Sequence, residues 1–157
     1  MSSLPALGAD GRGGLTLGGA RYLLIRPETL VGLQKAVEGA LGERAAACIA
    51  AGGRAGDARA TASLAGTPEK RVARLLGSGG EIGWGEFGLE RLTAAELVVS
   101  VHHSAVAEAY GPASAPVCHV IRGVLESLAA ATFGRPSTVV ETACVAMGAP
   151  ACRFVAS

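Results

Sequence analysis

Glu141, Cys144 and Cys152 lie within twelve positions of one another near the C-terminus, and Cys118 precedes them in the chain. Thiolates and carboxylates are ligands of divalent metals, and three thiolates with one further ligand would complete a tetrahedral zinc shell. Structural zinc sites more often use cysteines alone, or cysteines with one histidine, than a carboxylate, so His119 competes with Glu141 for the fourth place. Four protein ligands leave no open position for water, which predicts a structural ion.

Two other interpretations of these cysteines stay open at this point. No pair has CxxC spacing, so the cysteines could be small buried hydrophobic residues or could form one disulfide. Residues 1–19 lack the basic start and apolar core of a secretory signal, which predicts a cytoplasmic protein with reduced thiols. Cys48 falls on the apolar side of an expected helix and is predicted to belong to the core.

Composition narrows the class of protein. The chain has 157 residues, of which 50% are hydrophobic and 17% charged, with a formal net charge of +1. No segment concentrates basic residues, which argues against a nucleic-acid partner. No apolar run approaches the roughly 18 residues of a membrane span. We therefore expect a flexible, glycine-rich leader over residues 1–19 and a single domain over residues 20–157.

The elements that must position the candidate ligands alternate between helix and strand. A strand at 22–25 should lead into a helix from Pro27 to Gly42, with its apolar face formed by Leu30, Leu33, Val37 and Leu41 and with Gln34, Lys35 and Glu38 facing water. Further helices are expected over 43–55, from Pro68 to the glycines at 77–80, and over 114–132.

Strand patterns complete the prediction. A hairpin is expected within residues 81–104, and the runs 138–142 and 153–156 should pair as a terminal hairpin. Cys118 would lie in the first turn of the long helix, where the helix dipole favours a thiolate. The base of the terminal hairpin would bring Glu141, Cys144 and Cys152 together. Mixed elements with antiparallel pairing predict an α+β fold, an antiparallel twisted sheet packed with helices.

Five segments carry a resemblance to a known family: 26–30, 83–85, 109–112, 116–119 and 141–154. Through them, residues 20–156 resemble the 4-vinyl reductase domain family. This family includes a protein associated with 4-vinyl reduction in bacteriochlorophyll synthesis and the sensor domains of phenol- and toluene-responsive activators. The resemblance implies the ligand-binding fold found in NO signalling and Golgi transport, which is similar to subunits of vesicle-tethering complexes, and it implies a homodimer.

The resemblance also implies a ligand set for the metal. In the aromatic-sensing members three Cys and one Glu hold a zinc ion, and their motif falls on Cys118, Glu141, Cys144 and Cys152, which favours Glu141 over His119. The sensors bind small aromatic molecules between sheet and helices. The corresponding pocket residues here are Trp84, Leu97, Val99, Val101, His103, Tyr110 and Arg122. The sensor Trp falls near Leu97, and only 4% of the chain is aromatic, which argues against phenol itself as the ligand.

Three functions follow from the sequence and the resemblance. The first is a zinc-stabilised domain, a sensor or a carrier, that binds a hydrophobic or aromatic molecule, which could be a tetrapyrrole. The alternative is a bacteriochlorophyll-synthesis protein, either a 4-vinyl reductase or a carrier of a tetrapyrrole intermediate. The sequence contains no dinucleotide fingerprint and no recognisable flavin site as a hydride source, which argues against an enzyme. The third is an interaction subunit without a ligand cavity.

Overall fold

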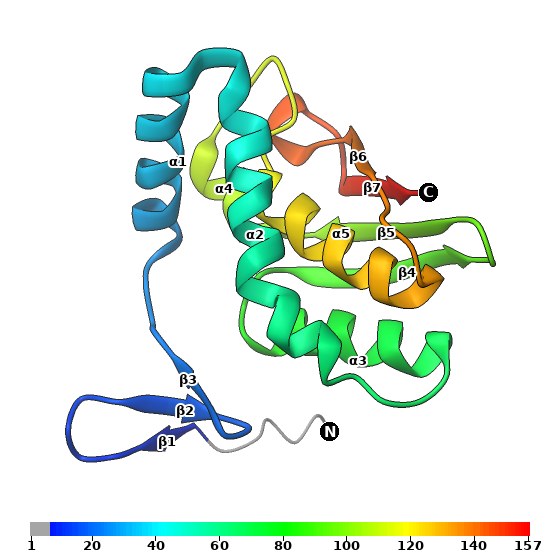
Figure 1. Ribbon diagram of the computed structural model, residues 1–157. Helices are drawn as coiled ribbons and strands as arrows, with labels where there is room; N and C mark the ends of the chain where they lie inside the picture. Colours follow the sequence, from blue (N-terminus) through cyan, green and yellow to red (C-terminus); the bar gives the residue numbers. More distant parts are fainter. Residues whose placement is uncertain (1–6) are drawn as a thin grey trace.

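The computed structural model describes residues 7–157 as two sheets and a group of helices (Figure 1). A small antiparallel meander contains β1 (Gly8–Ala9), β2 (Leu15–Leu17) and β3 (Ala20–Tyr22). A larger antiparallel sheet has the order β4–β5–β7–β6, formed by β4 (Glu86–Leu92), β5 (Leu97–His102), β7 (Cys152–Ala156) and β6 (Val139–Ala143). The helices are α1 (Pro27–Leu41), η1 (Gly42–Arg44), α2 (Ala45–Ala62), α3 (Pro68–Glu81), α4 (Ala105–Tyr110), α5 (His119–Phe133) and η2 (Val145–Met147). The predicted α+β fold and both predicted hairpins are confirmed.

The core lies between the larger sheet and the helices. Leu97, Val99 and Val101 alternate along β5 on the face toward the helices, and Phe154 of β7 lies opposite Val99. These four side chains are at most 1% exposed. Because successive strand residues point to opposite faces, Val140 of β6 faces outward and is 59% exposed. Alternation in the sequence therefore identified the buried face of this sheet.

Proline and a capping hydroxyl begin two of the predicted helices. Pro27 and Pro68 each occupy the start of a helix, α1 and α3. The Thr67 side chain caps α3 by accepting a hydrogen bond of 3.4 Å from the backbone N–H of Lys70. The chain leaves α1 at Gly42, whose φ of 54° favours glycine. The predicted starts of α1 and α3 are confirmed.

Helices α2 and α5 pack closely because glycine lies at their crossing. A Cβ atom on Gly53 of α2 would overlap the carbonyl group of Val120, and one on Gly123 of α5 would overlap the carbonyl group of Ala50. Arg54 of α2 also pairs with Glu126 of α5. Figure 1 shows α2 crossing in front of α5, which in turn lies over the sheet. This crossing fixes the helix that presents Cys118.

Two predictions about buried helix faces are wrong. On α1, Leu33 is 62% exposed whereas Gln34 is 3% exposed, because the Gln34 amide donates a hydrogen bond of 2.8 Å to the carbonyl oxygen of Val117. On α2, Cys48 is exposed, because Ala50 and Gly53 form the face toward α5. Polar contacts with a distant loop and the small residues of α2 overrode the apolar periodicity.

Boundaries also differ from prediction around the candidate ligands. The long helix α5 begins at His119 instead of 114, so Cys118 is its N-cap residue and does not lie in the first turn. The short helix α4 was not predicted; Ser104 begins it by accepting a hydrogen bond of 3.3 Å from the N–H of Ala107. The predicted strand at 22–25 is shorter, because β3 ends at Tyr22.

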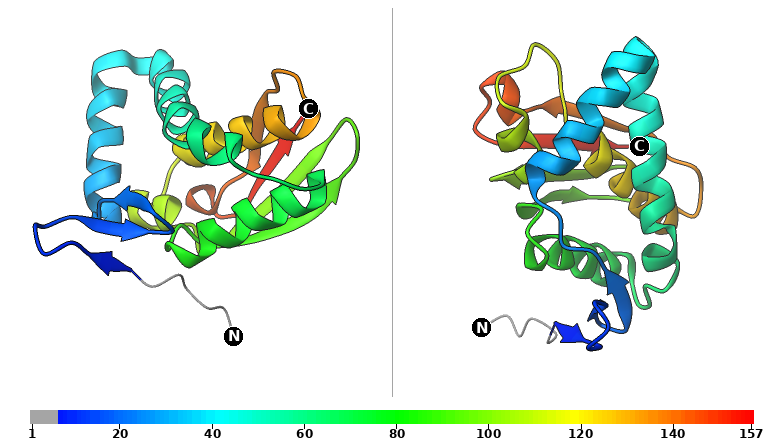
Figure 2. Two further views of the ribbon diagram at one scale, coloured as in Figure 1. Left: turned by 60° about the horizontal axis from the view of Figure 1, so that its bottom comes forward. Right: turned by 90° about the vertical axis from the view of Figure 1, so that its left-hand side faces the viewer.

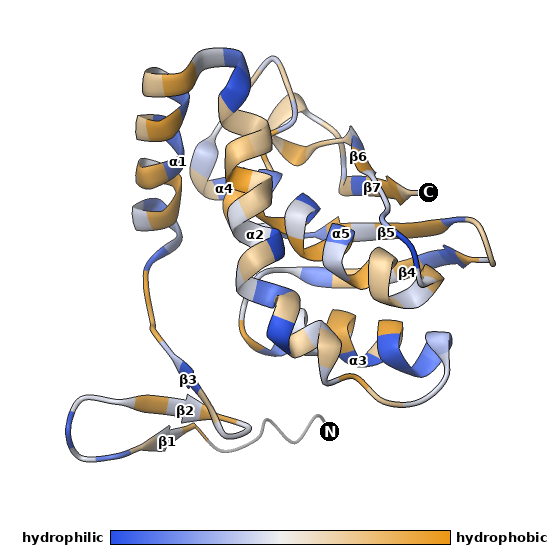
Figure 3. Cartoon of the chain, viewed as in Figure 1, coloured by the Kyte–Doolittle hydropathy of each residue, from blue (hydrophilic) through white to orange (hydrophobic). Residues whose placement is uncertain are grey.

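The N-terminal segment contains unexpected strands. Residues 1–6 lie outside the described part, and β1 and β2 fall within the predicted leader. Strands β1–β3 extend away from the larger sheet (Figure 2). The connection to α1 is apolar (Figure 3), and Leu23, Leu24 and Ile25 are 79%, 71% and 47% exposed. Flexibility of residues 1–19 stays a prediction. Across residues 7–157, no helix has both the length and the apolar character to cross a membrane.

A buried carboxyl group on α2 gives a testable pH dependence. The Oδ2 atom of Asp57 is buried without a hydrogen-bond partner, and burial raises the pKa of this group from 3.8 to about 6. The folded state therefore favours the protonated carboxyl, and that stability is lost as the pH rises from 4 through 6.

We expect Asp57→Asn to raise the free energy of unfolding by about 1–2 kcal/mol at pH 7.5. The gain should vanish near pH 4, where the carboxyl is protonated in both states. Thermal melts at both pH values would check this, with the exposed Glu86→Gln as control. An equal shift at the two pH values would contradict the assignment.

Candidate metal centre

Four different positions of the C-terminal half supply one side chain each. Glu141 lies on β6 and points to the helix side of the sheet, and Cys144 follows that strand directly. Cys152 is the first residue of β7, beside β6, and Cys118 caps α5. The turn between the strands is short because η2 ends at Gly148, whose φ of 92° suits glycine. The hairpin and the helix start thus converge on one point.

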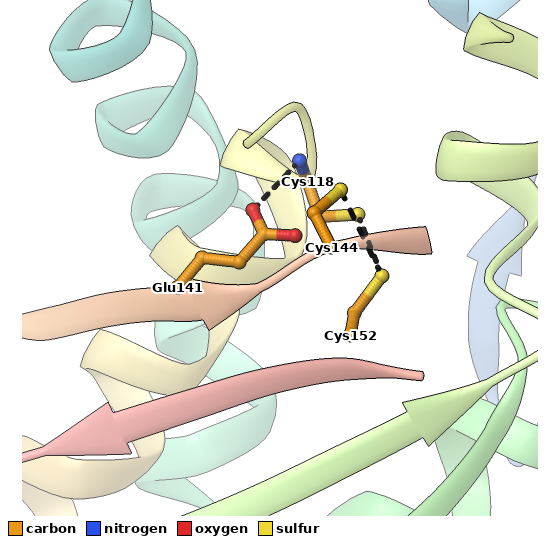
Figure 4. Close-up of side chains that lie close together, drawn as sticks. All are labelled: Cys118, Glu141, Cys144 and Cys152. Atoms are coloured by element: carbon orange, nitrogen blue, oxygen red, sulfur yellow. Dashed lines mark hydrogen bonds between the residues drawn. The ribbon is translucent and has the colours of Figure 1, made fainter. Parts of the chain in front are cut away.

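The four side chains form one compact, buried cluster (Figure 4). Their ligand atoms all lie within 4.8 Å of one another. The Sγ atom of Cys118 lies 3.6 Å from that of Cys152, which lies 4.0 Å from that of Cys144. Each cysteine is fully buried and Glu141 is 7% exposed. The structure therefore brings together every predicted ligand.

Neighbouring polar groups orient the cluster. The backbone N–H of Cys118 donates a hydrogen bond of 3.0 Å to Oε2 of Glu141. The backbone N–H of Val145 donates to Sγ of Cys152 at 3.4 Å, and the Ser104 hydroxyl lies 3.4 Å from Sγ of Cys118. Neither Val145 nor Ser104 was predicted, since their part in the site depends on contacts that no sequence motif marks. Such outer contacts fix ligand orientation in metal sites.

The donor set fits a divalent metal. The second carboxylate oxygen of Glu141, Oε1, is buried without a hydrogen-bond partner, which would be costly unless another group satisfied it. A tetrahedral ion with metal–sulfur bonds of about 2.3 Å holds its sulfur ligands about 3.8 Å apart. The two sulfur–sulfur distances lie on either side of that value. The cluster could hold a metal ion with little rearrangement.

Without a cation, the cluster retains protons. Burial, reinforced by Cys144, raises the pKa of Glu141 to about 9. Hydrogen bonds with Cys144 and Cys152, together with burial, raise the pKa of the Cys118 thiol, whereas bonding to Cys118 lowers the pKa of Cys144 to about 4 and also lowers that of Cys152. A bound divalent ion would displace the remaining protons.

The competing residues lie outside the cluster. His119 is half-buried and faces a neighbouring hollow instead of the four ligand atoms. Cys48 is exposed on α2. All four cysteines are free in the structure, so the cluster contains thiols and no disulfide.

Most residues predicted to line a ligand pocket are part of the closed core or the surface. Leu97, Val99 and Val101 are fully buried against the helices, and Trp84 packs half-buried at the edge of the same core. His103 follows β5 with a φ of 52°, and its side chain is 79% exposed beside Glu108. The structure does not bring these five residues together around one cavity.

The other two predicted pocket residues do share a hollow. Tyr110 and Arg122 line a hollow of about 690 Å³ between α1, the loop 111–117, the start of α5, and β6. Glu38 of α1 also lines it and was predicted only to face water. Glu38 accepts a hydrogen bond of 2.7 Å from the Tyr110 hydroxyl, a pairing across 72 positions that the sequence could not indicate.

An α+β domain whose terminal hairpin and capped helix bury a cluster of three cysteines and one glutamate is the class that fold and site define. Residues 97–157 match the model of the 4-vinyl reductase domain, and this part of the chain belongs to that family. The matched segment includes all four cluster residues. The resemblance is therefore confirmed over this segment. No match is found among curated proteins.

Two solved structures share the fold. One is the phenol-responsive sensory domain of the transcription activator PoxR with phenol, which is 22% identical, with a TM-score of 0.82, covering 95% of this chain and 82% of that one. The other is a vinyl-4-reductase family protein from Methanocaldococcus jannaschii, which is 14% identical, with a TM-score of 0.59, covering 82% of this chain and 76% of that one. At these identities the likeness concerns the fold.

Proposed function

We propose that the protein is a zinc-stabilised domain that binds a hydrophobic or aromatic small molecule, as a sensor or a carrier. The observation that carries the zinc assignment is the buried cluster of Cys118, Glu141, Cys144 and Cys152, whose ligand atoms lie within 4.8 Å of one another. Zinc accepts both thiolate and carboxylate ligands in tetrahedral geometry. With four protein ligands, zinc would stabilise the hairpin against α5 and leave no position for a reacting water.

The zinc assignment predicts one metal ion per chain. Protein purified without added metal and without a His-tag should contain about one equivalent of zinc by plasma mass spectrometry. Native mass spectrometry of the same sample would also reveal a co-purified ligand as extra mass. Four titratable thiols with no metal would refute the assignment.

Ligand binding is supported by the similarity to a domain solved with phenol. The strand β5 carries Leu97, Val99 and Val101 in a closed core, which favours a ligand other than phenol, bound elsewhere on the domain. A tetrapyrrole carrier or reductase is the alternative, and it would shift the Soret band of chlorophyllide on titration. An unshifted band would favour the small-molecule sensor or carrier.

We further propose a homodimer in which the N-terminal strands are covered by the partner. Strands of two or three residues are marginal in isolation, and the apolar connection 23–25 is exposed. Leu23→Ser with Leu24→Ser should shift the protein toward monomer by at least tenfold in dissociation constant. Sedimentation velocity would measure this, with Leu89→Ser on the exposed side of β4 as control. A monomeric wild-type protein would contradict the proposal.

A further inference from the structure

The hollow beside the metal centre has a polar end and an apolar wall. Its volume is about 690 Å³, and Glu141 of the cluster contributes to its lining. Pro112, Pro116 and Val117 come from the loop before α5, and Val140 comes from the outer face of β6. Proline restricts the loop backbone, so this wall is formed before any ligand binds.

Arg122 supplies a positive charge without a counter-charge. Its Nη2 atom donates a hydrogen bond of 2.9 Å to the carbonyl oxygen of Ala46, and its Nε atom is buried without a partner. Among residues 7–157, Arg54 and Arg153 form ion pairs with Glu126 and Glu90, but no carboxylate lies within ion-pair distance of Arg122. A half-buried guanidinium of this kind favours an anionic ligand.

The acidic groups that line the hollow do not neutralise Arg122. Glu38 accepts hydrogen bonds from the Tyr110 hydroxyl at 2.7 Å and from the Gln34 amide at 2.9 Å. Lys35 lies 4.4 Å from the centre of the Tyr110 ring and fixes it further. Glu43 also lines the hollow but is not paired with Arg122. The α5 start adds a partial positive charge beside Arg122, one turn along the same helix.

We propose that this hollow binds a small carboxylate with an aromatic or similarly apolar body. The carboxylate would pair with Arg122 near the start of α5, and the body would lie along Pro112, Pro116 and Val140. This inference rests on the proposed small-molecule binding and names its site and ligand class. Because β6 carries both Val140 and Glu141, the bound molecule would also lie beside the metal centre.

The test uses the zinc-loaded full chain with two matched probes, 2-naphthoate and 2-naphthol. They share the aromatic body and differ in the charged group. We expect 2-naphthoate to bind more tightly and to shift the backbone amide resonances of Tyr110, His119 and Val140. Arg122→Gln should weaken 2-naphthoate by about tenfold or more and leave 2-naphthol within about twofold. Arg59→Gln, on the exposed end of α2, is the control and should change neither.

A second variant keeps the test independent of Arg122. Val140→Asp places a negative charge on the exposed wall and should weaken 2-naphthoate more than 2-naphthol. Equal binding of 2-naphthoate to wild type and Arg122→Gln, or resonance shifts confined to other regions, would overturn the inference. Binding of 2-naphthol alone would overturn it while supporting an aromatic-binding function. If neither probe binds, the inference fails, whereas the zinc content of the same sample still tests the metal assignment.

Discussion

Cys144→Ala is expected to release the metal and to lower the free energy of unfolding by more than about 4 kcal/mol. Cys144 is fully buried between the β6 end and the α5 start, and its loss leaves three ligands for the ion. Because metal affinity at a structural site contributes directly to folding stability, the terminal hairpin should lose its attachment to the helix. Cys152→Ala should behave in the same way.

Metal analysis and thermal melts of the same preparations would check this prediction. Cys48→Ala is the matched control, since Cys48 is exposed on α2 and lies outside the cluster. It should retain the metal and change the free energy of unfolding by less than about 0.5 kcal/mol. A Cys144 variant that keeps both its metal and the wild-type melting temperature would show that the cluster is not a metal centre.

The metal cluster could be predicted because its parts are local. Glu141, Cys144 and Cys152 belong to one hairpin, whose strands and turn are evident from alternation and from Gly148. Cys118 comes from elsewhere in the chain, and its inclusion depended on the family resemblance. Spacing alone left His119 open as a ligand, and only the packing of the α5 start separates these two neighbours.

Burial on the peripheral helices could not be predicted in the same way. Gln34 is buried because its amide meets the carbonyl group of Val117, 83 positions away. Leu33 is exposed because α1 packs on one side only, against α2 and α4. Helical periodicity identifies a face only when a single apolar stripe meets the core, and α1 has no such stripe.

The ligand site was only partly predictable for a related reason. Leu97, Val99 and Val101 were correctly predicted to share one face, but packing against α5 leaves no hollow there. Whether a sheet face lines a cavity depends on the size of residues on another element. Tyr110 and Arg122 do line a hollow, whose Glu38 and Pro112 come from separate segments. Tertiary packing decides such sites, and the sequence pattern does not contain it.

Gly123→Ala is expected to lower the free energy of unfolding by about 3 kcal/mol, although alanine favours helices. Its Cβ would overlap the carbonyl group of Ala50 and the backbone nitrogen of Arg54, both on α2. These are backbone atoms of a helix, so no side-chain rotation can relieve the overlap. The helices would have to separate, and α5 would move Cys118 relative to the hairpin ligands. We therefore expect a loss of metal affinity as well.

The matched control is Gly52→Ala, on the open side of α2. No atom lies within 4 Å of the position that its new methyl group would occupy. It should raise the free energy of unfolding by about 0.5–1 kcal/mol through helix propensity alone. Gly53→Ala should resemble Gly123→Ala, because its Cβ would overlap the carbonyl group of Val120 on α5. Denaturant unfolding of the three variants separates close packing from helix propensity: if Gly123→Ala were as stable as Gly52→Ala, the crossing would not depend on glycine.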